Sequence, residues 1–179
     1  SCAVFIIGSL ARSSSLPLPP WPSVSSNPSK LPVAWHNSTW IADRAIDFIK
    51  QDHDKPFCMW VSFPDPHHPF DCPEPWASLH RPEEVDLPEH RMRDLEGRPW
   101  WHKAAVETKI EGKGAEIRTS YSRYPEIPDE HLREVIANTY GQLSLIDHSV
   151  GRIITELEAQ GLAENTYIVY TADHGDWLG

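Results

Sequence analysis

The sequence has few cysteines and no long apolar run. Its three cysteines, Cys2, Cys58 and Cys72, form no C-x-x-C pair, which argues against both a disulfide framework and a zinc ribbon. Residues 2–11 are apolar but too few to cross a bilayer, and no basic leader precedes them. We expect either a buried strand or the remnant of a signal sequence there. The compartment is left open, and with no clear leader or membrane span in the sequence we expect the cytoplasm slightly more than another compartment.

Basic residues are also in deficit. Sixteen Lys and Arg stand against 26 Asp and Glu, giving a formal net charge of -10. This charge repels phosphate backbones and anionic lipids, so we expect neither nucleic acid nor a membrane as a partner. An anionic substrate would need a metal ion or a local cluster of Arg and Lys to reverse the sign of the field.

What is present allows a folded domain. The chain has 179 residues, 40% of them hydrophobic, with eight Trp, which suffices for one core. The 17 Pro against nine Gly predict much irregular backbone. Residues 12–32 are rich in Ser and Pro without a hydrophobic period, so we expect residues 1–35 to form a poorly ordered arm and residues 36–179 a catalytic domain.

Apolar periodicity predicts two helices and two strands in that domain. Residues 39–52 have apolar positions at helical spacing after Asn37, Ser38 and Thr39, any of which could cap a helix. The run FCMWVSF at residues 57–63 predicts a buried strand between prolines. A long helix is expected over residues 129–159 with Gly161 at its end, followed by a strand at residues 166–172. The strand–helix–strand order predicts an α/β fold with a parallel or mixed sheet and flanking helices.

Polar motifs follow both predicted strands, where ligands gather in open α/β sheets. Asp173 and His174 are a carboxylate and an imidazole suited to a divalent cation, although the same residues could simply end a strand in a turn. His67 and His68 lie between two prolines, so an imidazole there could be held to donate a proton or hydrogen bond. The alternative is a surface loop with solvated histidines. Asp65, beside them, is expected to be a solvated loop carboxylate.

Three segments together resemble one known family. FCMWVSFPDPHHPFDCPEPW, RPWWHK and the stretch NTYGQLSLIDHSVGRIITELEAQGLAENTYIVYTADHGDWLG are similar to the sulfatases of the alkaline phosphatase superfamily, especially the branch with phosphonate monoester hydrolases and choline-sulfatase-like enzymes. The resemblance runs over residues 36–179. It implies an alkaline-phosphatase-like fold, incomplete in this chain, and a small-molecule sulfate or phosphonate ester as substrate.

The resemblance also implies residue roles. Asp173 and His174 match two metal ligands of the D-H-G motif, and His67 matches the histidine that contacts the transferred group or the leaving oxygen. His68 occupies the variable position of that motif and is a second candidate for substrate binding. The family implies one divalent ion, with calcium expected and manganese or zinc as alternatives.

The nucleophile expected of this family is missing. Its members use a C-x-P-x-R or S-x-P-x-R motif whose first residue becomes formylglycine, and no such motif occurs in the sequence. We therefore expect a sulfatase-type hydrolase fragment that is inactive alone. A phosphonate or phosphate ester hydrolase and a non-catalytic remnant remain as alternatives, and the oligomeric state is left open.

Overall fold

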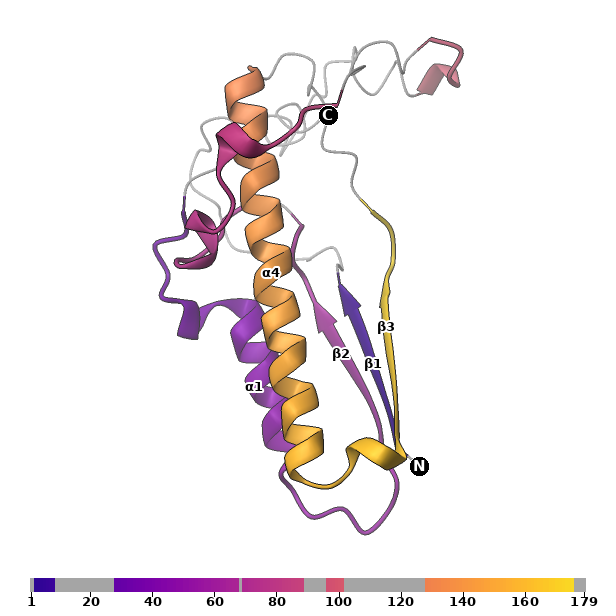
Figure 1. The fold of residues 1–179 in the computed structure, drawn as a ribbon. Helices are drawn as coiled ribbons and strands as arrows, with labels where there is room; N and C mark the ends of the chain where they lie inside the picture. Colours follow the sequence, from indigo (N-terminus) through magenta and orange to yellow (C-terminus); the bar gives the residue numbers. More distant parts are fainter. Residues whose placement is uncertain (1, 9–27, 68, 89–95, 102–127, 176–179) are drawn as a thin grey trace, which may run out of the picture.

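Three parallel strands form the sheet of the computed structural model, which describes residues 2–8, 28–67, 69–88, 96–101 and 128–175 (Figure 1). They are β1 (Cys2–Gly8), β2 (Cys58–Phe63) and β3 (Thr166–Ala172), in the order β2-β1-β3. The two strands predicted in the domain are therefore confirmed as near neighbours in one parallel sheet. The amino-terminal apolar run is a strand and lies between them, so residues 2–8 of the predicted arm belong to the sheet.

Two helices connect the strands. Helix α1 (Asn37–Ile49) lies between β1 and β2 in the sequence, and helix α4 (Asp129–Ala159) lies between β2 and β3. Figure 1 shows the two helices side by side, running along the sheet next to β2. In the described part of the chain, no helix has the length and apolar character needed to cross a membrane.

The start of α1 differs from the prediction. The N-cap is His36 and not one of the three residues after it. The His36 Nδ1 accepts a hydrogen bond from the Ser38 backbone N–H at 3.4 Å. An imidazole nitrogen here does what a Ser or Asp oxygen usually does for an unpaired helical N–H. The helix consequently begins at Asn37, two residues before the expected start.

Helix α4 ends as its sequence predicts. Gly161 has φ +67°, and its N–H donates to the Glu158 carbonyl while the Leu162 N–H donates to the Leu157 carbonyl. This pair of hydrogen bonds is a Schellman motif, in which a residue with positive φ satisfies the last carbonyls of a helix. Gly161 is thus one position beyond the cap residue Gln160.

The main core lies between the two helices and one face of β2. Its buried members are Ala42, Ala45, Ile46, Ile49, Val61, Phe63, Ile146, Ile153 and Leu157. An ion pair of 2.6 Å between Arg152 and Asp43 joins the helices at the rim of this core. Burial of these apolar side chains is the main force holding α1 and α4 against β2.

The strand predicted at residues 57–63 is buried on one face only, so the prediction of a buried strand was wrong for its other face. In β2 the side chains alternate, with Val61 and Phe63 buried and Trp60 60% exposed. In β3, residues 167–172 are all exposed, and Tyr167 is 74% exposed. The described helices cover one face near β2 and leave β3 uncovered, which explains why an apolar sequence is exposed here.

Candidate functional site

The two polar motifs begin at the same edge of the sheet. Phe63, the last residue of β2, and Ala172, the last residue of β3, both pair with Gly8 of β1. Because neighbouring strands lie about 4.8 Å apart, these two strand ends are about 10 Å from one another. His67 follows β2 by four residues and Asp173 follows β3 directly. The shared edge expected from the sequence is therefore present.

Asp173 and His174 form a compact pair beyond β3. Asp173 Oδ1 accepts the His174 backbone N–H at 2.8 Å, and His174 Nδ1 lies 2.8 Å from the Gly175 carbonyl oxygen. Since a carbonyl oxygen only accepts, Nδ1 carries the proton in this contact. The neutral ring then has Nε2 unprotonated, which is the form in which imidazole coordinates a metal.

The geometry of this pair fits the metal that the resemblance implies. His174 Nε2 lies 3.6 Å from Asp173 Oδ2. Two ligand atoms bound to one divalent cation at about 2.0–2.6 Å each lie at most about 5.2 Å apart, so both atoms can reach the same cation. Within the described residues no group of three or more His, Cys, Asp or Glu side chains is placed to hold a metal. Among the described residues, Asp173 and His174 are thus the two candidate ligands at this edge of the sheet.

His67 lies in a tight turn at the exit of β2. Its backbone N–H donates to the Pro64 carbonyl at 3.2 Å, and its side chain is half-buried. Two buried phenylalanines, Phe63 before the turn and Phe70 after it, fix where the turn leaves and rejoins the body. A half-buried imidazole with a fixed backbone can present its ring to a ligand at the sheet edge. His68 lies outside the described residues.

Asp65 is a buried polar residue whose burial the sequence did not predict. It was expected to be solvated, yet it is only 8% exposed and its Oδ2 accepts a hydrogen bond from the Ser38 hydroxyl. His36 Nδ1 lies 3.6 Å from the same oxygen. Burial raises the pKa of Asp65, while His36 and the Ser38 hydroxyl oppose the rise. The proline on each side of Asp65 was the available signal, because it marks a fixed backbone.

Cys72 is a poor nucleophile. Its side chain is fully buried, and burial together with the carboxylates of Asp65 and Glu74 raises the pKa of its thiol to about 12. At neutral pH it is a protonated thiol and packs as a small apolar side chain.

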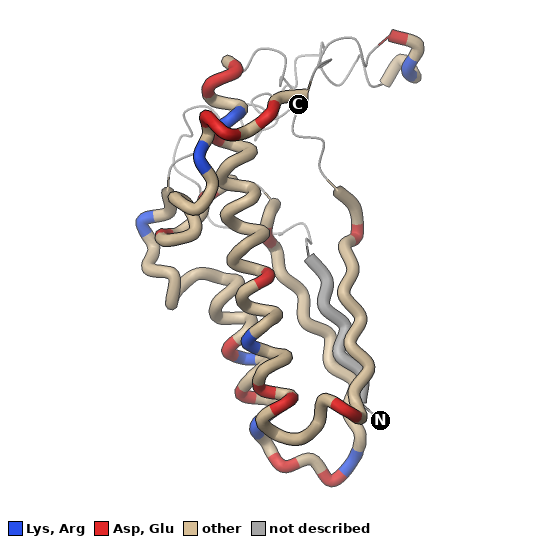
Figure 2. Tube along the Cα trace, viewed as in Figure 1, with Lys and Arg blue, Asp and Glu red and all other residues tan. Residues whose placement is uncertain are grey.

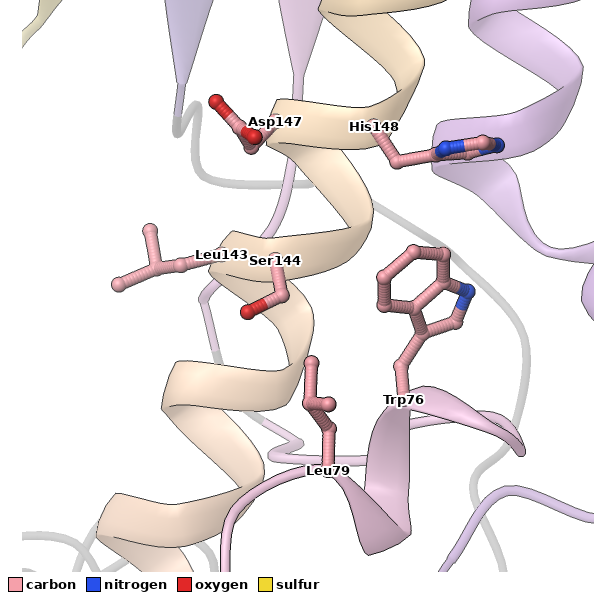
Figure 3. Close-up of a pocket in the computed structure, with 6 residues that line it drawn as sticks. All are labelled: Trp76, Leu79, Leu143, Ser144, Asp147 and His148. Carbon is pink, nitrogen blue, oxygen red and sulfur yellow. The ribbon is translucent and has the colours of Figure 1, made fainter.

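A pocket of about 570 Å³ lies on the outer side of α4, against the short helix η2 (Trp76–Ser78). Figure 3 shows its lining residues, Trp76, Leu79, Leu143, Ser144, Asp147 and His148. None of them belongs to the motifs at the sheet edge. The pocket and the candidate site therefore share no residue.

Charge is unevenly distributed over the elements. Strands β2 and β3 contain no charged residue, whereas charged residues gather along the helices and in the loop between α1 and β2 (Figure 2). The positive field that an anionic ester requires is thus not supplied by the strands. A cation held by Asp173 and His174 would supply it at the sheet edge.

Comparison with known proteins gives one consistent family. The sulfatase family model matches residues 16–179. The chain is 32% identical over 145 residues to an arylsulfatase of Clostridium perfringens, with 80% of this chain and 27% of the relative covered. It is 25% identical over 174 residues to the multifunctional alkaline phosphatase superfamily protein PehA of Trinickia caryophylli, covering 88% of this chain and 31% of the relative.

The fold is also shared with solved structures. The phosphonate monoester hydrolase of Agrobacterium radiobacter superposes with a TM-score of 0.68 at 23% identity, covering 88% of this chain and 31% of that one. At this identity the likeness shows an alkaline-phosphatase-like fold and nothing about substrate. The chain spans less than a third of the length of each of these relatives.

Proposed function

This chain belongs to the sulfatase family, and from that premise we propose that it supplies part of the active site of a metal-dependent sulfuric ester hydrolase. In this proposal His67 acts on the ester, and Asp173 with His174 holds a divalent cation. The observation that supports it most is the pairing of Phe63 and Ala172 with the same residue, Gly8. It puts both motifs at one edge of a parallel sheet, where substrates of such folds bind.

Each residue has a distinct role. The His67 imidazole donates a proton or hydrogen bond to the leaving oxygen of the ester, where negative charge develops as the bond breaks. His68 is a second candidate for contact with the substrate. Asp173 supplies a carboxylate oxygen and His174 its Nε2 to the ion, for which calcium is the first candidate and manganese or zinc the alternatives. When bound, the cation supplies positive charge against the ester oxygens.

The chain lacks the residue that would attack the ester. Neither C-x-P-x-R nor S-x-P-x-R occurs in the sequence, and the high pKa of the Cys72 thiol makes it a poor substitute. We therefore propose that the 179-residue chain has no turnover by itself. Formylglycine would have to come from sequence that this chain does not contain.

A phosphonate or phosphate ester hydrolase is the second candidate. The support is the 25% identity to PehA, a relative whose name places it among multifunctional members of the superfamily. Phosphate and sulfate esters present the same tetrahedral oxygens to His67 and to a cation. A non-catalytic remnant, which binds an ion or a partner without turnover, is the third candidate.

Metal binding by the intact chain tests the proposal. Free Mn²⁺ measured by electron paramagnetic resonance should fall on addition of the chain, with a dissociation constant on the order of 1 mM, because two protein ligands hold an ion weakly. The substitutions Asp173→Asn and His174→Gln should each abolish this binding. Asp147 and His148 provide a matched control, since they are a second adjacent Asp–His pair and are both exposed on α4.

In that control, Asp147→Asn and His148→Gln should leave Mn²⁺ binding unchanged. Equal loss on substituting either pair would show only weak binding to scattered carboxylates. Absence of any binding would remove the metal from the proposal.

A further inference from the structure

Three polar side chains are buried together where β2 leaves the sheet and α1 begins. His36 is 7%, Ser38 0% and Asp65 8% exposed. Ser38 lies in the first turn of α1 and Asp65 lies two residues after β2, so 27 positions of sequence separate the hydrogen-bonded partners. A buried polar group is retained without penalty only when it is hydrogen-bonded, and this pair meets that condition.

The turn after β2 has unusually few backbone donors. Pro64 and Pro66 have no N–H, and the His67 N–H donates within the turn, to the Pro64 carbonyl at 3.2 Å. Asp65 lies between these prolines and its side chain reaches away from the turn to Ser38. Pro64 and Pro66 have no backbone N–H with which to bond to the rest of the protein. The Asp65 side chain makes this connection instead, through its hydrogen bond with Ser38.

The carboxylate of Asp65 faces α1 through this bond. Its Oδ2 accepts a hydrogen bond from the Ser38 hydroxyl and lies near His36. The first turn of α1, to which Ser38 belongs, carries the positive end of the helix dipole. Asp65 is therefore engaged in holding two elements together. It is a different kind of residue from Asp173, which is at the sheet edge and more exposed.

We propose that Asp65 is a positioning residue for His67, fixing the Pro64–His67 turn to the first turn of α1 through the Ser38 hydroxyl. The importance of this for catalysis rests on the proposed role of His67. The structural claim, that Asp65 fixes the Pro64–His67 turn to α1, does not depend on that role. A histidine whose backbone is held in this way can keep its ring aimed at one point of the sheet edge.

Hydrogen exchange of the His67 amide in the full 179-residue chain tests the proposal, with the Leu145 and Ile153 amides of α4 as internal references. Ser38→Ala and Asp65→Ala should each raise His67 exchange about tenfold or more relative to the references, because the hydrogen bond between the Ser38 hydroxyl and Asp65 is lost. Asp65→Asn keeps an oxygen that can accept from Ser38 and should restore the His67 protection to within about threefold of the unmodified chain.

Ser149→Ala is the matched control. Ser149 is also a fully buried helical serine, but its Oγ has no hydrogen-bond partner among the described residues. This substitution should leave His67 exchange unchanged. The His67 ring resonances should shift in Ser38→Ala and not in Ser149→Ala, which is a local signature that a general loss of stability would not give.

Two results would overturn the proposal. One is an equal rise of exchange at His67 and at the α4 references in Ser38→Ala, which would mean that the bond stabilises the whole fold and does not position the turn. The other is a failure of Asp65→Asn to restore protection. Failure of the chain to bind Mn²⁺ at Asp173 and His174 would leave this test unaffected, so the two proposals fail separately.

Discussion

Gly141 of α4 lies so close to Trp76 that a Cβ atom built on it would be 2.5 Å from the Trp76 carbonyl oxygen. The same Cβ would lie 2.8 Å from the Cys72 Sγ. The absence of a side chain therefore lets η2 and the segment after the His67 turn pack directly on α4. The pocket wall that Trp76 forms depends on this close approach.

Gly141→Ala should lower the free energy of unfolding by about 1–3 kcal/mol, because the added methyl group meets a backbone atom that cannot move aside cheaply. Gly151 in the same helix has nothing within 4 Å of a built Cβ. Gly151→Ala should therefore raise the free energy of unfolding by about 1 kcal/mol through helix propensity alone. Urea denaturation of both variants measures this, and similar effects of the two substitutions would contradict the packing described.

The core and the uncovered strand should respond differently to the same truncation. Ile153 is 0% exposed between the helices, and Ile168 of β3 is 38% exposed. Ile153→Ala should lower the free energy of unfolding by about 2–5 kcal/mol, and Ile168→Ala by about 1 kcal/mol or less. Denaturation of the isolated chain is the measurement. A large loss for Ile168→Ala would mean that β3 is covered in solution.

Stability should depend on pH through Asp65 in a direction unusual for a carboxylate. The pKa of Asp65 is raised above its ordinary value of 3.8, chiefly by burial. Just above pH 3.8 the folded state keeps a proton that the unfolded state has lost, so the free energy of unfolding falls as the pH rises through this window. Above the folded pKa the contribution is constant.

Asp65→Asn removes this titration and keeps the shape. The stability of the Asn variant minus that of the unmodified chain should therefore increase as the pH rises from below 3.8, and then level off. Taking this difference cancels the other carboxylates, which titrate in both proteins. A difference that shrinks with rising pH would show that His36 and Ser38 outweigh burial and lower the pKa of Asp65.

The isolated chain should show no turnover of an aryl sulfate or an aryl phosphonate above background, with Ca²⁺, Mn²⁺ or Zn²⁺ added, because its sequence contains neither C-x-P-x-R nor S-x-P-x-R, the motifs that carry the family's nucleophile. The chain carrying His67→Ala and the chain carrying Asp173→Ala are the controls. Activity that persists in both variants would indicate a contaminating hydrolase. Activity that both substitutions abolish would show that another group in the chain acts as the nucleophile.

Much of the fold followed from local patterns in the sequence. The apolar run ending at Phe63, the β-branched run ending at Ala172 and the helical spacing before Gly161 each identified an element within a residue or two. These signals are local because strand alternation, helical periodicity and the left-handed helix end depend on neighbouring residues. The D-H-G and P-H-H-P motifs were placed at the sheet edge by the same reasoning, since parallel strands end on one side.

Other features depend on contacts that the sequence does not display. The burial of Asp65 requires the first turn of α1, which is distant along the chain, and the capping by His36 requires its ring to turn back onto Ser38. The exposure of β3 could not be inferred from its apolar residues. Their pattern indicates that a strand forms, but it does not show whether another element packs on that strand. Each of these is decided by tertiary packing.

Whether His67 shares a site with Asp173 and His174 can be measured by adding Mn²⁺ and following histidine ring resonances by NMR, since paramagnetic broadening falls steeply with distance. His53 is the control, because it precedes β2, whose six residues put it about 20 Å from the opposite edge. With a shared site, the His174 and His67 rings broaden first and His53 does not. Broadening of His53 before His67, or broadening of His174 with His67 unaffected, would show that the two motifs do not form one site.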